Sequence, residues 1–107
     1  MKNFWTYSAP LTPTDPPLAC TMSRAEWEQI TPGYRRAIWK DHTERPCAAH
    51  GWTSYRYAGR YGTIMIGATS TQDALNEANR SLTHGVASID RLEIWNALTG
   101  LYEKVKV

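Results

Sequence analysis

The sequence has little cysteine and no long hydrophobic run, and each shortage excludes a class of protein. Two cysteines in 107 residues are too few for the disulfide framework of a small secreted domain. No apolar stretch approaches the roughly 20 residues of a membrane-spanning helix, and the first residues lack the apolar core of a signal peptide. We therefore expect a cytoplasmic protein without a membrane partner, in which Cys20 and Cys47 stay reduced.

An excess of charge of one sign is also lacking. Twelve Lys and Arg stand against ten Asp and Glu, which gives a formal net charge of +2 at pH 7. This balance excludes a strongly basic nucleic-acid-binding domain but leaves room for a local basic patch. Phenylalanine occurs once, whereas five Trp and six Tyr give a large aromatic content. These rings either fill the core, which is the commoner place for any one of them, or anchor a binding surface.

The stretch from Thr53 to Ala68 has the pattern of a β-hairpin. With Gly59-Arg60 as a two-residue turn, Tyr57 pairs with Gly62, and moving the turn back by one residue keeps the same side chains on each face. One face is then mainly apolar, and the other is a polar and aromatic mixture that can meet solvent, a ligand or the N-terminal region. The first face holds Tyr55, Tyr57, Ile64, Ile66 and Ala68, and the second holds Ser54, Arg56, Tyr61, Thr63 and Met65.

The hairpin is followed by signals for a helix and a second hairpin. Ser70 begins a helix with an apolar stripe of Ala74, Leu75, Ala78 and Leu82, whose opposite side, including Glu77, should be solvated. Residues 89–95 alternate as a half-buried strand, 96–100 form a turn, and 101–107 read as an edge strand. These elements predict a ββαββ core over residues 52–107.

Two short helices and a proline-rich arm precede this core. Ser23 and Glu26 form a capping box, and Thr31-Pro32 begins a second helix that reaches Lys40, with Tyr34, Ile38 and Trp39 on its apolar side. Residues 1–22 should be an extended aromatic arm, either free or packed along the domain. The predicted fold class is therefore α+β, with one domain over 23–107, a helical part at 23–41 and a sheet of about four strands.

Residues 42–51 read as a loop with the only clustered metal-ligand types. A zinc site there would need Cys20 together with His42, Cys47 and His50, in a spacing that matches no standard zinc pattern, so we expect no metal and no cofactor. Catalysis has the least support. The Cys47-His50 pair has no fixed geometry and no third group to orient it. The neighbouring Asp41, His42 and Glu44 form a charged loop next to a helix end, which is usually solvated.

The string GRYGTIMIGATSTQDALNEANRSL, with LEIWN downstream and SRAEWEQITPGYR upstream, resembles small accessory open reading frames of tailed bacteriophages and prophages. The resemblance covers most of the chain and has no active-site motif attached to it. It implies an accessory protein in the cytosol of a bacterial host, and a contact with a host factor.

Two functions are predicted as alternatives. The first is a non-enzymatic module that binds a protein partner through exposed aromatics, for which the candidates are Trp5, Tyr7, Trp52, Tyr61 and Trp95. The second is nucleic-acid binding by the hairpin, in which cationic side chains neutralise phosphates and Tyr61 stacks on a base. Its candidates are Arg56, Arg60 and Tyr61, joined by Arg35, Arg36 and Lys40. With either function, the chain could also form a homodimer by pairing a free strand edge with that of a second copy.

Overall fold

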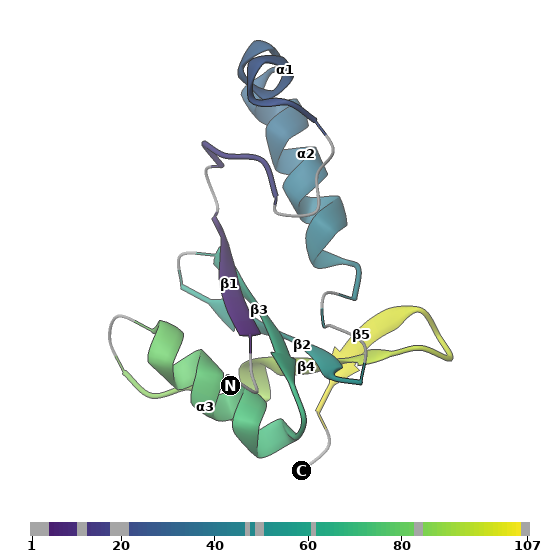
Figure 1. Cartoon of the computed structure of the whole chain (residues 1–107). Helices are drawn as coiled ribbons and strands as arrows, with labels where there is room; N and C mark the ends of the chain where they lie inside the picture. The colour runs from purple at the N-terminus through teal and green to yellow at the C-terminus, as the bar shows by residue number, and fades with distance from the viewer. Residues whose placement is uncertain are drawn as a thin grey trace.

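The computed structural model describes residues 5–10, 13–17, 22–46, 48, 51–60, 62–82 and 85–105 (Figure 1). The predicted α+β fold class is confirmed, with the ββαββ order of the core. The elements are β1 (Trp5–Pro10), α1 (Arg24–Gln29), α2 (Pro32–Thr43), β2 (Thr53–Gly59), β3 (Gly62–Ala68), α3 (Thr71–Ser81), the 3-10 turn η1 (Ile89–Arg91), β4 (Leu92–Asn96) and β5 (Leu101–Lys104).

The sheet has five strands in the order β1-β3-β2-β4-β5, all antiparallel to their neighbours. The four strands predicted for the core are present, and β5 is at an edge as expected. The fifth strand comes from the region predicted to be an arm, since residues 5–10 pair along β3 from Trp5 opposite Gly67 to Pro10 opposite Gly62. For these residues the open question of a free or packed arm is answered in favour of packing.

The β2–β3 hairpin has the predicted faces in a register shifted by two residues. Tyr57 pairs with Ile64 rather than with Gly62, because the ladder ends at a pair of glycines, Gly59 and Gly62. A Cβ atom on Gly59 would lie 2.7 Å from the Gly62 carbonyl oxygen, and Gly62 has a φ of 145°, so both positions favour glycine. A two-residue shift keeps every side chain on its predicted face.

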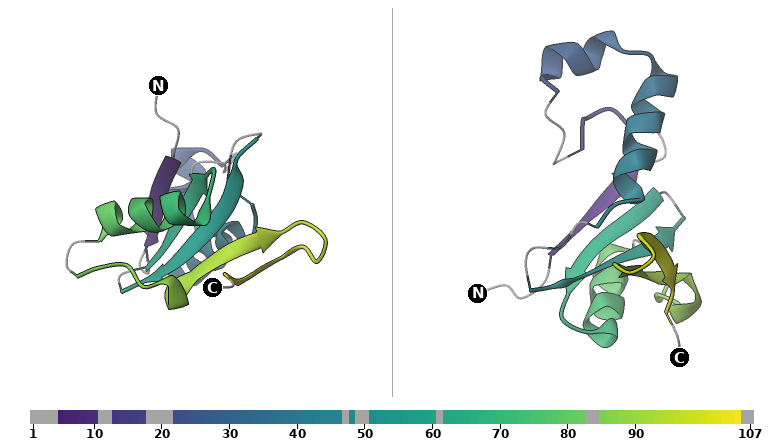
Figure 2. Two further views of the ribbon diagram at one scale, coloured as in Figure 1. Left: turned by 90° about the horizontal axis from the view of Figure 1, so that it is seen from below. Right: turned by 90° about the vertical axis from the view of Figure 1, so that its right-hand side faces the viewer.

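The two faces of the sheet pack against different parts of the chain. Helix α3 covers one face, where it lies across β3 and β1 (Figures 1 and 2). Ala74 and Ala78 of its predicted apolar stripe are fully buried there, and Leu75 and Leu82 pack beside them, so the stripe faces the sheet as predicted. The core on this side comprises Tyr55, Tyr57, Ile64, Ile66, Ala68, Ala74, Ala78, Ala87 and Leu92.

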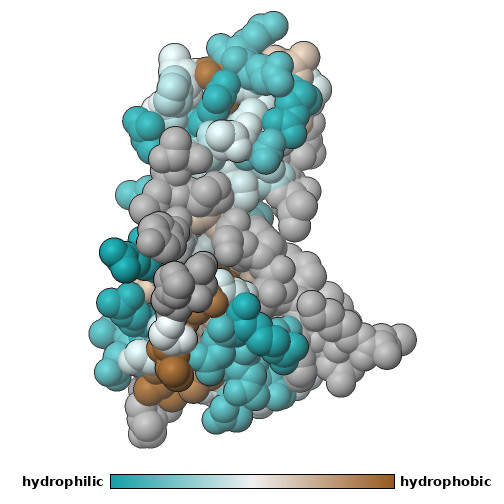
Figure 3. Space-filling model, turned by 90° about the vertical axis from the view of Figure 1, so that its left-hand side faces the viewer, coloured by the Kyte–Doolittle hydropathy of each residue, from teal (hydrophilic) through white to brown (hydrophobic). Residues whose placement is uncertain are grey.

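Helices α1 and α2 extend beyond the end of the sheet (Figure 1), and the side of them seen in Figure 3 is mainly hydrophilic. Both predicted caps are present: Ser23 and Glu26 complete a capping box, and Thr31 caps a helix that starts at Pro32. Trp27 and Trp39 pack with Ala9 of β1 in a second, smaller core. 

Several side chains and element ends differ from the prediction. Strand β5 ends at Lys104, so Val105 lies outside the strand predicted over 101–107. Helix α2 continues to Thr43, so His42 lies on a helix rather than in a loop, and Tyr34 is 57% exposed because it faces away from the smaller core. Strand β4 begins at Leu92 because the three preceding residues form η1. Glu77 is buried rather than solvated, because it lies on α3 beside the buried Ala78.

The second face of the sheet is partly covered by the chain that follows α2. A Cβ atom on Gly67 would lie 3.2 Å from both the Cβ atom of Ala48 and the Trp52 ring. The Ala48 amide donates a hydrogen bond of 2.8 Å to the Ser54 hydroxyl, and Met65 is fully buried. Gly67 therefore lies where residues 48 and 52 come closest to β3. No helix among the described residues has the length and apolar character needed to cross a membrane.

Candidate functional site

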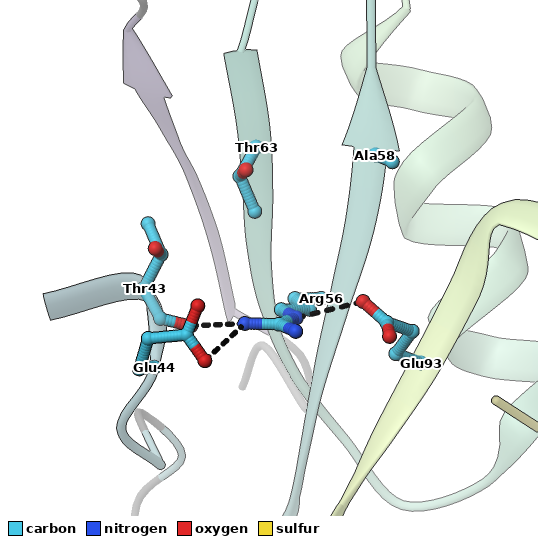
Figure 4. Close-up of a pocket in the computed structure, with 6 residues that line it drawn as sticks. All are labelled: Thr43, Glu44, Arg56, Ala58, Thr63 and Glu93. Carbon is cyan, nitrogen blue, oxygen red and sulfur yellow. Dashed lines mark hydrogen bonds and ion pairs between the residues drawn. The ribbon is translucent and has the colours of Figure 1, made fainter. Parts of the chain in front are cut away.

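Arg56 is the centre of a polar cluster on the second face of the sheet (Figure 4). Its Nε atom donates a hydrogen bond to Glu93 Oε1 at 2.8 Å. Its Nη1 atom lies 3.2 Å from Glu44 Oε2 and donates to the Thr43 carbonyl oxygen at 2.9 Å. The side chain is only 17% exposed, so these contacts replace most of its hydration.

Strand register and a helix end together bring these groups to Arg56. Arg56 and Glu93 are directly opposite each other in the β2–β4 ladder, and therefore share a face of the sheet. Thr43 is the last residue of α2, where carbonyl groups lack partners within the helix. A cation at that position satisfies one of these carbonyls and also interacts favourably with the negative end of the helix dipole.

The Arg56 guanidinium also lies over the ring of Tyr102 in β5, with its Cζ atom 4.5 Å from the ring centroid. The Tyr102 hydroxyl donates a hydrogen bond of 2.9 Å to the carbonyl oxygen of Arg45, just after α2. The ring of Trp95 meets Tyr102 edge-on at 5.3 Å. Through these contacts the β4–β5 hairpin is attached to β2 and to the end of α2.

Electrostatics favours the charged form of Arg56. Burial lowers the pKa of Arg56, but the hydrogen bond and charge of Glu93, together with Glu44, outweigh that effect and raise the pKa above its ordinary value. The cluster thus holds one cation between two carboxylates, and its own charge favours neither phosphate nor a second anion.

A hollow of about 230 Å³ lies beside the cluster. Its described lining offers threonine hydroxyls and carboxylates but no nucleophile paired with a base, so we assign it no reaction. The cluster instead fixes how the β4–β5 hairpin is oriented. The residues that line the hollow are Thr43, Glu44, Arg56, Ala58, Thr63 and Glu93.

The predicted protein-binding aromatics are only partly placed. Trp52 is half-buried against Gly67, and Trp95 is half-buried on β4. Tyr61 and the side chains of Trp5 and Tyr7 lie outside the described residues.

Two of the six predicted nucleic-acid-binding residues, Arg35 and Arg56, are partly buried and make hydrogen bonds within the chain. Arg56 belongs to the polar cluster, and Arg35 donates hydrogen bonds to the carbonyl oxygens of Trp27 and Glu28 at 3.1 and 3.0 Å. Arg36 and Lys40 are exposed on α2, Arg60 is exposed after β2, and Tyr61 lies outside the described residues. A phosphate at Arg56 would therefore lie beside the carboxylates of Glu44 and Glu93.

The sequence interpretation missed Leu98, the most exposed large apolar side chain among the residues whose exposure the structure describes. It is 97% exposed in the turn between β4 and β5, and the neighbouring Leu101 is 59% exposed. The only sequence signal was a leucine inside the turn predicted at 96–100, where polar residues are usual.

The suggested four-ligand metal set falls largely outside the described residues, which include His42 but not Cys20, Cys47 or His50. Within the described ranges, no three His, Cys, Asp or Glu side chains are grouped so that they could hold a metal ion.

No protein family, curated protein or solved structure matches this chain.

Proposed function

We propose that this protein is a non-enzymatic protein-binding module whose recognition element is the β4–β5 hairpin, residues 92–104. The observation that supports it best is Leu98, an apolar side chain 97% exposed in a turn that is closed by hydrogen bonds to Asn96. Single exposed leucines are common. A leucine presented by a fixed turn, next to the exposed Leu101, is a better candidate for an anchor.

The turn is held by both side-chain and backbone contacts of Asn96. The Leu98 amide donates to Asn96 Oδ1 at 2.9 Å, and the Gly100 amide donates to the Asn96 carbonyl oxygen at 2.8 Å. Asn96 Nδ2 in turn donates to Glu103 Oε1 at 3.0 Å, across the hairpin. Gly100 has a φ of 70°, which favours glycine at the end of the turn.

A fixed tip reduces the conformational entropy lost on binding. The Arg56 cluster fixes the base of the same hairpin through Glu93 and Tyr102. Burying one leucine against a partner contributes about 1.5–3 kcal/mol. Leu98 and Leu101 together thus supply a small apolar anchor on a rigid support, with Trp95, one of the predicted aromatics, in the same hairpin.

Nucleic-acid binding has less support. Arg56, the central cation of that hypothesis, is held between Glu44 and Glu93, and its release would leave two carboxylates beside the phosphate. The resemblance to phage accessory open reading frames favours a bacterial host protein as the partner.

A photoreactive apolar residue placed at position 98 tests the proposal. In nuclease-treated bacterial lysate, it should crosslink to one discrete protein, because a bound partner would cover the tip. The same residue at position 86, where Val86 is 81% exposed on a segment outside the hairpin, is the matched control and should give no such product. Equal products at the two positions, or none at position 98, would refute a hairpin anchor.

A further inference from the structure

The helices α1 and α2 hold a proline-rich segment of the same chain, residues 13–17, which belongs to no helix or strand. The Trp27 indole Nε1 donates a hydrogen bond to the Thr14 carbonyl oxygen at 3.1 Å. The Trp39 indole Nε1 donates to the Asp15 carbonyl oxygen at 2.7 Å. Both rings are buried, so two consecutive carbonyl groups of the segment are bound by donors that water scarcely reaches.

One side chain of the segment is bound as well. Arg24 Nη1 lies 2.8 Å from Asp15 Oδ1 and 3.4 Å from the Thr14 carbonyl oxygen. Pro13 and Pro17 are buried, whereas Thr14 and Asp15 are exposed. The helices thus bind two carbonyl groups and one carboxylate of a segment whose first and last prolines are buried.

This chemistry is that of proline-rich peptide recognition. Domains that bind such peptides use aromatic grooves, because a proline-rich segment is already stiff and loses little entropy on binding. Proline also lacks an N–H group, so each proline in the segment leaves one backbone donor fewer to be satisfied on burial. The aromatic donors and Arg24 fit a segment in which an acidic residue stands between prolines.

We propose that Arg24, Trp27 and Trp39 form a binding site for proline-flanked acidic peptides, and that residues 13–17 occupy this site in cis. Side chains of α1 and α2 make the contacts that hold residues 13–17 in this site. Strand β1, by contrast, is held to β3 by a backbone ladder. A peptide from another protein with the pattern Pro-x-Asp-Pro-Pro can therefore replace it by making the same contacts. This site is separate from the hairpin and does not depend on its role.

A labelled peptide with the sequence of residues 11–19, LTPTDPPLA, tests the site by fluorescence anisotropy. In the full chain, a tethered segment competes at an effective concentration of about millimolar, so wild type should bind the peptide weakly. The full-chain variant P13S/D15S weakens the tethered segment and leaves the three site residues unchanged. It should bind the peptide at least about tenfold more tightly than wild type.

Changes to the site should then lower this affinity in the P13S/D15S background. Trp39→Phe keeps an aromatic ring, smaller than indole, but removes the N–H donor, and should weaken binding about two- to tenfold. Arg24→Ala removes an exposed ion pair, and should weaken binding by up to about fivefold. A peptide with the residues of LTPTDPPLA in scrambled order is the matched control and should not bind.

Three results would overturn the proposal: P13S/D15S binding no more tightly than wild type, insensitivity to Trp39→Phe, or equal binding of the scrambled peptide. If P13S/D15S loses α-helical circular dichroism, residues 13–17 are a fixed part of the helical core, and the proposal is likewise wrong. Leu98 takes no part in this measurement. A negative result would therefore refute the peptide site and leave the hairpin proposal untouched.

Discussion

The guanidinium of Arg56 lies over the ring of Tyr102, with its Cζ atom 4.5 Å from the ring centroid. This contact joins strands that are not neighbours in the sheet, since β4 lies between β2 and β5. With the ion pair to Glu93, it adds the side-chain contacts of Arg56 to the backbone ladders that join the β4–β5 hairpin to β2.

Replacing Arg56 by Met should destabilise the protein by about 2–3 kcal/mol, because Glu93 and the Thr43 carbonyl oxygen would lose a charged partner in a largely buried site. Urea unfolding followed by circular dichroism measures this loss. Arg36→Met, at an exposed position of α2, is the control and should change stability by less than about 0.5 kcal/mol. Equal effects of the two substitutions would contradict the central role of Arg56.

Stability should fall when the pH is lowered through the range of His42. Burial, with the charge of Arg45 as a second cause, lowers the pKa of this imidazole below its ordinary value, and its ring meets Trp39 edge-on at 5.7 Å. Between the lowered pKa and about 6.5, the unfolded chain therefore binds more protons than the folded chain, so the folded state loses stability as pH falls.

This pH effect is measured as the free energy of unfolding from pH 7.5 to 5.5. His42→Gln should have a flatter profile than wild type below about pH 6.5, because the variant lacks this proton uptake. Parallel profiles of the two proteins would show that His42 has no part in the pH dependence.

Gly67→Ala should cost about 1–3 kcal/mol, because its Cβ atom would lie 3.2 Å from both Ala48 and Trp52. Gly33→Ala is a matched control, since a Cβ atom there meets only Arg36 Nη2 at 3.8 Å and alanine favours the helix. Thermal unfolding should thus show a lower melting temperature for the first variant and an unchanged or higher one for the second. The opposite order would mean that residues 48–52 do not pack on β3.

Glu77→Met should be neutral or stabilise the protein by about 1 kcal/mol. Glu77 is only 2% exposed, and its Oε1 atom has no hydrogen-bond partner within the described structure. Its ion pair with Arg80 at 3.3 Å is made to a well-exposed side chain, so methionine of similar volume removes a desolvation cost and loses little. Destabilisation by more than about 1 kcal/mol in urea unfolding would point to a structural need for the carboxylate.

The sequence predicted best what is decided locally. The caps at Ser23, Thr31 and Ser70 rest on residues within one helical turn, and all three are confirmed. The faces of the β2–β3 hairpin follow from side-chain alternation, which survives the error in the turn.

What the sequence did not predict depends on contacts between distant segments. A proline-rich composition indicates an extended chain but not its partner, so the pairing of β1 with β3 was left open. Arg56 and Glu93 are 37 residues apart, and nothing in either neighbourhood signals their ion pair. Leu101 and Tyr102 face opposite sides of β5, and the sequence did not reveal which of them is buried. Tyr102 is the buried residue, because the side chains of Arg56 and Trp95 pack against its ring.

The most direct test of the proposed function is the amount of partner retained by the immobilised protein when Leu98 or Val86 is changed to serine. Both side chains are strongly exposed, at 97% and 81%, so neither change should affect folding. With nuclease-treated bacterial lysate, Leu98→Ser should lower the retention of one discrete protein about tenfold or more, since about 1.5–3 kcal/mol of apolar burial would be lost, while Val86→Ser should retain it fully. Equal retention by wild type and both variants would contradict the hairpin as the recognition element.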